Sequence, residues 1–252
     1  MRIYAVAAVA ALALFTSVSV HAQTTEAAIK AAIADPARPE ADRSTDADRK
    51  PAELIAFAGI KPGDKVLELI PGRGYFLRIF SKLVGPSGHV YELVTEEEAK
   101  ASAKGADAIK ALAADNAYKN VTAMVQPVAA FKVPEPVDFV WTSQNYHDLH
   151  DKEFGPADMA AFNKAVFAAL KPGGVFLITD HAAQAGSGLR DTETLHRIDP
   201  AAVKSEVQAA GFVLEAESDI LKESGDDHTL KIFDPKTRGK TDKFVFRFRK
   251  PR

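Results

Sequence analysis

From residue 65 to residue 180 the chain alternates apolar runs of strand length with helical patterns, and this alternation constrains the fold most. The runs lie at 65–70 (KVLELI), 89–94 (HVYELV), 121–126 (VTAMVQ), 137–143 (VDFVWTS) and 174–180 (GVFLITD). Helical patterns at 75–84, 96–114 and 157–170 separate several of them. Strands that alternate with helices usually pair in parallel. We therefore predict a doubly wound α/β fold, with a mostly parallel sheet and helices on both faces.

The last third of the chain changes rhythm. A helix is expected near 199–210 and a strand near 212–220, and the run KFVFRFRK at 243–250 alternates phenylalanine with basic residues. Strict alternation is typical of an antiparallel strand with two different faces. We expect this segment to form an antiparallel C-terminal edge strand.

The first 22 residues have the pattern of a secretory signal peptide. Arg2 is followed by a long apolar stretch and by Val20-His21-Ala22, a small-residue cleavage site. The alternative is a membrane anchor that stays attached, but the apolar stretch is short for a span. We expect cleavage before Gln23 and a periplasmic or secreted protein. A further alternative is that the signal is unused and the protein stays in the cytosol.

Three segments follow from these patterns. Residues 1–22 are the expected signal peptide, and 23–58 an N-terminal helical extension with helices near 24–34 and 44–58. Residues 59–252 are the expected α/β domain.

Composition narrows the possible partners. From Gln23 onward the chain keeps 31 Lys and Arg against 34 Asp and Glu, a formal charge of −3. This balance argues against nucleic-acid binding, which requires a basic face. The chain has no cysteine, which excludes thiol catalysis, zinc–thiolate sites and iron–sulfur clusters. No other long apolar run follows the signal, so we expect no membrane contact after its removal. Nothing in the pattern determines an oligomeric state.

The first run ends in a glycine-bearing loop, KVLELIPGRGYF at 65–76. In open α/β sheets ligands bind beyond the carboxyl ends of the strands. A dinucleotide fingerprint requires a third glycine where Leu77 stands, and the Gly-Lys-Ser/Thr of a phosphate-binding P-loop is absent. The loop is therefore expected to bind another ligand; the alternative is a tight turn without one.

Four segments carry a resemblance to a known family. The loop, KPGD at 61–64, GPSGHVY at 85–91 and LKPGGVF at 170–176 together resemble the class I S-adenosylmethionine-dependent methyltransferases over nearly the whole mature chain. ELIPGRGYF, NYHDLH, AGFVLEAESDIL and FDPKTRGKTDKFVFRFRKP resemble, more narrowly, a subgroup of exported predicted methyltransferases. The resemblance implies a Rossmann-like fold, S-adenosylmethionine as cofactor and a small-molecule acceptor.

The resemblance also implies where the cofactor binds. The candidate residues are Glu68, Ile70, Gly72, Gly74, Glu92, Val94, Gln126 and Asn145. Glu68 and the two glycines match the family's first motif, whereas Ile70 replaces its first glycine. Val94 stands where the family has an acid for the ribose hydroxyls at the tip of the second strand, with Glu92 one pleat earlier. Gln126 stands where an acid often lies near the adenine.

The acids after Val94 have a simpler explanation. Thr95 and Glu98 have the spacing of a capping box, and Glu96 and Glu97 then occupy the first helical turn. We expect all three acids to serve the helix rather than the ribose.

The stretch WTSQNYHDLHD at 141–151 follows the fourth strand and provides the catalytic candidates Tyr146, His147 and His150. Methyl transfer to a hydroxyl or a protonated amine requires a base, and histidine titrates near neutral pH. Tyr146 would hold the acceptor or face the cationic sulfonium. The alternative is that this polar run only caps the strand.

Three further alternatives remain open. His147, His150, His181, His196 and His228 could provide imidazole ligands for zinc, manganese or iron, but no short ligand motif such as H-E-x-x-H appears and we predict no metal. Arg197, His196 and Arg238 would close over the crevice and choose an anionic acceptor; alternatively, Glu193 and Asp199 form a local ion pair with Arg197. The departures from the first motif also allow an exported, non-catalytic binding protein on the same frame.

Overall fold

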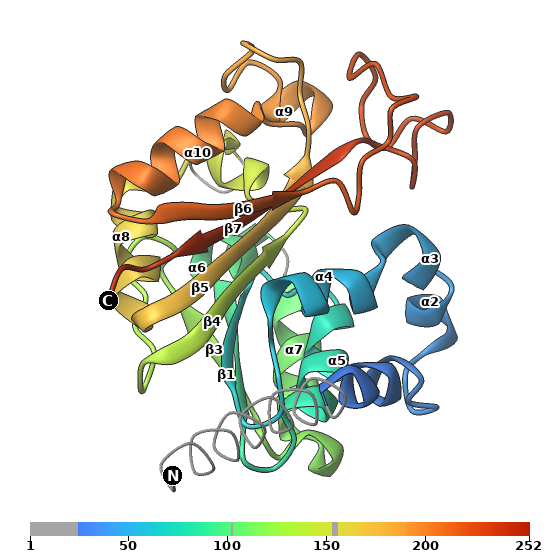
Figure 1. The fold of residues 1–252 in the computed structure, drawn as a ribbon, viewed down its shortest axis with the longest axis vertical. Coiled ribbons are helices and arrows are strands. Elements are labelled where there is room, and N and C mark those ends of the chain that lie inside the picture. Colours follow the sequence, from blue (N-terminus) through green and yellow to red (C-terminus); the bar gives the residue numbers. More distant parts are fainter. Residues whose placement is uncertain (1–24, 102, 153–155) are drawn as a thin grey trace, which may run out of the picture.

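The computed structural model describes residues 25–101, 103–152 and 156–252, so the expected signal peptide lies outside the described residues. Seven strands form one sheet in the order β3-β2-β1-β4-β5-β7-β6 (Figure 1). The strands are β1 (Lys65–Leu69), β2 (His89–Thr95), β3 (Val121–Gln126), β4 (Val137–Ser143), β5 (Leu170–His181), β6 (Val213–Ser218) and β7 (Lys243–Arg249). Every strand expected from the sequence is present, which confirms the α/β fold.

The chain direction sets where a ligand can bind. Strands β1 to β5 pair in parallel, and the strand order reverses between β1 and β4. A crevice at the carboxyl ends of strands is expected at such a reversal. β7 is antiparallel as expected. It lies second from the edge, because β6 also pairs with it and occupies the edge position.

The helices follow the expected order. They are α2 (Glu40–Arg43), α3 (Asp46–Arg49), α4 (Pro51–Ala58), α5 (Tyr75–Val84), α6 (Glu96–Ala101), α7 (Ala103–Ala114), α8 (Met159–Ala169), α9 (Thr192–Leu195) and α10 (Pro200–Ala209), with short 3₁₀ turns η1 (Asn116–Tyr118) and η2 (His147–His150). Residues 25–33 are also helical. The single helix expected over 44–58 is divided at Lys50, whose φ of 44° is left-handed. A residue before proline disfavours the helical conformation, and Pro51 then begins α4.

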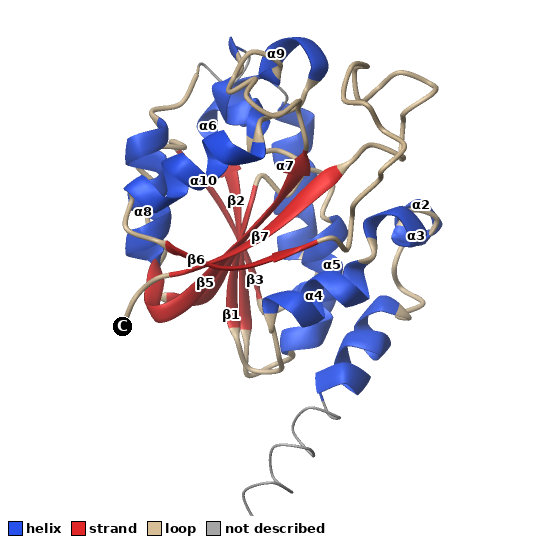
Figure 2. Ribbon diagram, turned by 45° about the horizontal axis from the view of Figure 1, so that its top comes forward, coloured by secondary structure: helices blue, strands red, loops and turns tan. Residues whose placement is uncertain are grey.

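Helices cover both faces of the sheet (Figure 2). On one face α8 and α10 pack through residues such as Phe162 and Val203 against the three phenylalanines of β7. On the other face α4, α5, α7 and residues 25–33 pack against Trp141 and Val90. In the described part of the chain, no helix is both long and apolar enough to cross a bilayer.

Candidate functional site

A cavity of about 620 Å³ lies at the carboxyl ends of β1, β4 and β5, where the strand order reverses. Five segments line it: α2–α3, the β1–α5 loop, α6, the segment after β4, and residues from the C-terminal third. The lining includes Thr45, Arg49, Glu68, Ile70, Gly72, Glu98, Ser143, Gln144, Asn145, His147, Asp148, His181, His196 and Phe233. Of the eight cofactor candidates, the cavity therefore contains Glu68, Ile70, Gly72 and Asn145.

The β1–α5 loop keeps a glycine-like backbone although its first glycine is replaced. Ile70 has a φ of 53°, and Gly72 and Gly74 have values of 57° and 77°. A branched residue with positive φ is a genuine outlier, with a cost on the order of 1–3 kcal/mol. Hydrogen bonds hold Ile70 in place: its N–H donates to Leu93 O (2.9 Å), and Asn145 Nδ2 donates to its carbonyl (2.8 Å). Asn145 thus supports the loop as well as lining the cavity.

The two remaining glycines differ in their surroundings. A Cβ on Gly72 would meet nothing within 4 Å, and Gly72 lines the cavity. A Cβ on Gly74 would lie 2.8 Å from Leu112 Cδ1, and Gly74 is the N-cap of α5. Gly72 therefore leaves space for a ligand, whereas Gly74 allows α5 and α7 to approach each other.

Two buried carboxyl groups lie side by side on β1 and β2. Glu68 and Glu92 are register partners, with exposed fractions of 4% and 0%. Apart from Glu68, no hydrogen-bonding group of the described residues reaches either oxygen of Glu92. Burial raises the pKa of Glu68 to about 8, and burial together with the charge of Glu68 raises the pKa of Glu92 well above its usual value. Glu92 does not line the cavity; it contributes a buried proton beneath Glu68.

The structure places Val94 and Gln126 outside the cavity lining. Val94 is 1% exposed and packs into the core beneath the helices, and β2 continues past it to Thr95. The side-chain amide of Gln126 is bonded to the backbone of Lys132, accepting from its N–H (2.8 Å) and donating to its carbonyl (3.0 Å). Val94 was expected near the ribose and Gln126 near the adenine, but neither side chain lines the cavity.

Glu98 was expected to serve only its helix, and it does more. The capping box is present, because Thr95 Oγ1 accepts from Glu98 N–H (2.9 Å) and the Glu98 carboxyl accepts from the Thr95 backbone. Its Oε2, however, is buried without a partner in the described residues, and the side chain lines the cavity. Burial raises the pKa of Glu98 to about 7. The sequence shows the capping pattern of Glu98, but it does not show that Glu98 Oε2 is buried at the cavity.

His147 is the one catalytic candidate in the cavity, and its environment differs from that of a free base. Its Nδ1 lies 2.8 Å from Asp180 Oδ1, and its Nε2 lies 3.0 Å from Asp148 Oδ1. Burial opposes its charge, but Asp180 and Asp148 outweigh burial and raise the pKa of His147 to about 10. An imidazole that already holds its proton at neutral pH accepts no other, so the expected role of general base does not fit.

Tyr146 and His150 lie outside the cavity lining, on the side of α8 and α10. Tyr146 is fully buried, donates to Glu206 Oε2 (2.9 Å) and accepts from Asn163 Nδ2 (2.9 Å). His150 Nε2 lies 3.4 Å from Glu206 Oε2. These side chains connect η2 to α8 and α10. The sequence of residues 141–151 did not indicate this structural role.

The N-terminal extension forms a wall of the cavity that the sequence did not predict. Asp46 on α3 accepts two hydrogen bonds from Arg38 (2.8 and 2.7 Å) and one from the Tyr75 hydroxyl (2.6 Å). Arg78 on α5 donates to Asp42 (3.0 Å). These bonds fasten α2 and α3 over the start of α5, which brings Arg49 into the cavity lining.

Residues of the C-terminal third form the opposite wall. His196 and Phe233 line the cavity with their rings 5.1 Å apart. Arg197 is fully buried and makes a two-bond ion pair with Asp226 (2.8 and 3.1 Å), so it is not available to an anionic acceptor. Arg238 is exposed and lies outside the cavity lining. Arg197 therefore forms an ion pair, but its partner is Asp226, 29 residues along the chain, and not the neighbouring Glu193 or Asp199.

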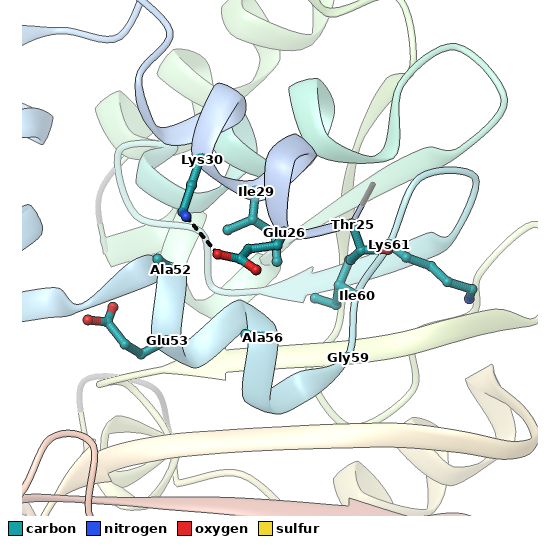
Figure 3. Close-up of a pocket in the computed structure, with 10 residues that line it drawn as sticks. All are labelled: Thr25, Glu26, Ile29, Lys30, Ala52, Glu53, Ala56, Gly59, Ile60 and Lys61. Atoms are coloured by element: carbon teal, nitrogen blue, oxygen red, sulfur yellow. Dashed lines mark hydrogen bonds and ion pairs between the residues drawn. The ribbon is translucent and has the colours of Figure 1, made fainter. Parts of the chain in front are cut away.

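A second cavity, of about 650 Å³, lies between residues 25–33 and α4 (Figure 3). Ile29 and Ile60 provide its apolar lining, and the charged groups at its rim are exposed. Glu26 and Lys30 bond each other there (2.6 Å). The cavity at the strand ends is the stronger candidate, because it combines buried acids with a strained loop. Three of the five described non-glycine residues with positive φ, namely Ile70, Gln144 and His196, line it.

Comparison with known proteins gives one family match. Residues 43–217 match the model of a methyltransferase domain. The chain is 38% identical over 74 residues to the protein-L-isoaspartate O-methyltransferase of Ignicoccus hospitalis, covering 29% of this chain and 32% of that protein. It is 30% identical over 129 residues to the ubiquinone/menaquinone biosynthesis C-methyltransferase UbiE of Cupriavidus taiwanensis, covering 50% of this chain and 46% of that protein.

The chain thus spans about a third and about half of the length of these relatives. Among solved structures, a SAM-dependent methyltransferase from Aquifex aeolicus is similar, with a TM-score of 0.59 and 20% identity. The alignment covers 84% of this chain and 95% of that one. At this identity the likeness shows a shared fold.

Proposed function

Because the chain belongs to the methyltransferase domain family, we propose that it transfers a methyl group from S-adenosylmethionine to a small-molecule acceptor. The observation that carries the proposal is the β1–α5 loop. It keeps three left-handed residues, two of which (Ile70 and Gly72) line the cavity, even though isoleucine replaces the first glycine. Such a conformation costs free energy and persists where the surroundings require it, which is common at ligand sites.

The residues of the cavity fit this cofactor. Glu68 Oε2, Glu98 Oε2 and Ser143 Oγ are buried there without a hydrogen-bond partner in the described residues, and a bound ligand with amino and hydroxyl groups would satisfy them. The free backbone N–H groups at the start of α5 suit a carboxylate. The bound cofactor would supply an electrophilic methyl group. Glu68 and Glu98 would orient it, and α2–α3 would exclude water.

Calorimetry with S-adenosylmethionine and S-adenosylhomocysteine tests the proposal. We expect one binding site per chain. Gly72→Ala should weaken S-adenosylhomocysteine at least tenfold, about 1.4 kcal/mol, because its methyl group would project into the cavity. Gly188→Ala is a matched control, with a similar φ of 59° and the same open surroundings but no place in the cavity lining. Equal losses in both variants, or no binding to the unmodified protein, would refute the proposal.

A non-catalytic binding protein on the same frame is the alternative, and it rests on the departures from the family's first motif, such as Ile70 in place of its first glycine. Incubation with methyl-labelled S-adenosylmethionine and a metabolite extract separates the two. Label transferred to an acceptor supports the enzyme. Binding without transfer over many extracts supports the alternative.

We also propose that the chain is exported and acts in the periplasm or outside the cell. The support is the sequence pattern at 1–22. Mass spectrometry of protein from its native host should find an N-terminus at or near Gln23. Full-length protein in the cytosolic fraction would overturn this proposal and leave the methyltransferase proposal intact.

A further inference from the structure

Three side chains from two separate segments converge on the wall of the strand-end cavity. They are His147 and Asp148 at the start of η2, and His196 just after α9. Their potential ligand atoms lie within 4.8 Å of one another. Asp148 Oδ1 is 3.0 Å from His147 Nε2 and 3.5 Å from His196 Nδ1. Ligands bound at about 2.0–2.2 Å to a tetrahedral metal are roughly 3.4 Å apart, so these separations suit one shared ion.

We propose that His147, Asp148 and His196 form a binding site for a divalent transition metal ion, with zinc as the first choice. Two imidazoles and one carboxylate are a donor set that suits zinc, manganese or iron and does not suit magnesium. All three side chains line the cavity. A three-ligand site of this kind leaves at least one coordination position open toward the cavity.

The surroundings of His147 are those of a metal ligand. Its second ring nitrogen, Nδ1, lies 2.8 Å from Asp180 Oδ1, the carboxylate–histidine arrangement that orients metal-bound imidazoles. Asp180 is fully buried and accepts the backbone N–H groups of His147 and His181, both at 2.7 Å. The ring of His147 is therefore held in one orientation, with Nε2 toward Asp148.

The position of His196 is also fixed by its neighbours. It has a left-handed φ of 54°, and the next residue, Arg197, is locked by its ion pair with Asp226. Asp151 lies beside it, with Oδ2 3.8 Å from His196 Nδ1, and its Oδ1 is buried without a partner in the described residues. Asp151 thus adds a further buried carboxylate beside the three ligands, and its negative charge favours a cation there.

The site has a consequence for the acceptor, which rests on the proposed function. An open position on a metal within the cavity would hold an acceptor through an oxygen or nitrogen donor. The acceptor class would then be molecules with a hydroxyl, carboxylate or amine able to coordinate the ion. The metal site itself does not depend on this consequence.

Metal binding can be measured without methyl transfer. Tag-free protein, first stripped of metal with a chelator, would be titrated with Zn²⁺, Mn²⁺ and Mg²⁺ by calorimetry and by competition with a chromogenic chelator. We expect one Zn²⁺ per chain, weaker Mn²⁺ and no Mg²⁺ binding at the same concentrations. Asp148→Asn and His196→Gln should each weaken Zn²⁺ by at least about tenfold, and Asp180→Asn by about 10–100-fold.

His228→Gln is the control, because His228 pairs with Asp242 outside the cluster. It should bind Zn²⁺ like the unmodified protein. Asp148 and His196 have side chains about one-fifth exposed, so their variants are expected to fold, and circular dichroism checks this. Unchanged affinity in both folded variants, loss of affinity in His228→Gln, or binding of Mg²⁺ alone would overturn the site. Failure to bind S-adenosylhomocysteine with Zn²⁺ binding intact would overturn only the proposed function.

Discussion

Replacement of Glu92 by glutamine should stabilise the protein, and the gain should depend on pH. Glu92 is fully buried beside Glu68, and no other group of the described residues bonds its oxygens. A glutamine has nearly the same shape and carries no ionisable proton. Its amide can donate to Glu68 at any pH, whereas the Glu92 carboxyl can donate only while it is protonated.

The direction in which stability changes with pH follows from how many protons the folded and unfolded states bind. Each acid has a folded pKa above its unfolded value of 4.5. The folded state therefore binds more protons than the unfolded state above pH 4.5, and the free energy of unfolding falls as pH rises from there through the folded pKa. For Glu68 the rise from 4.5 to about 8 corresponds to an upper bound of about 5 kcal/mol. We expect Glu92→Gln to recover roughly 2–4 kcal/mol at pH 8, because the pair shares this cost and relaxation reduces it.

Urea unfolding followed by tryptophan fluorescence would measure the difference at pH 4.5, 6 and 8. The variant should match the unmodified protein near pH 4.5 and be more stable at pH 8. Glu135→Gln is a control with the opposite pH dependence, because Lys65 and Tyr91 lower the pKa of this half-exposed acid. It should lose stability relative to the unmodified protein as pH rises through the normal range of glutamate. A pH-independent difference, or a Glu92→Gln variant less stable at pH 8, would refute the reasoning.

Three further predictions concern single side chains. Gly74→Ala should lower the free energy of unfolding by about 1–3 kcal/mol, since its Cβ would collide with Leu112; urea unfolding checks this, and an unaffected midpoint would contradict it. Tyr146→Phe should cost about 1–3 kcal/mol by stranding Glu206 and Asn163, yet leave S-adenosylhomocysteine affinity unchanged; a specific loss of affinity would place Tyr146 in the site after all. Asp46→Asn should loosen α2 and α3 from α5, visible as faster amide exchange over residues 40–50, whereas unchanged exchange would mean that other contacts hold them.

The order of elements was predictable from the sequence. Periodicity identified all seven strands, and Phe244, Phe246 and Phe248 were correctly expected on one face of an antiparallel strand. The loop at Gly72 and Gly74 was located because a strand, a glycine loop and a helix follow one another. These features depend on neighbours in the chain, so local patterns record them.

Side-chain direction at the strand ends was less predictable. Tyr146 and His147 are adjacent in the sequence, yet one is buried among α8 and α10 and the other lines the cavity. Val94 was expected at a strand tip, but β2 extends past it and its side chain joins the core. A shift of one residue reverses the face that a side chain occupies, and the sequence does not fix strand ends to one residue.

The sequence alone determined the α/β fold, the position of the glycine loop and the family resemblance, because each depends on spacing along the chain. Only the tertiary structure placed Arg49 in the cavity, gave His147 two carboxylate partners, and brought His196 to Asp148. Asp180 and His196 lie tens of residues from His147 in the chain. Such contacts arise from the packing of whole elements, which adjusts pKa values and ligand distances that no local pattern encodes.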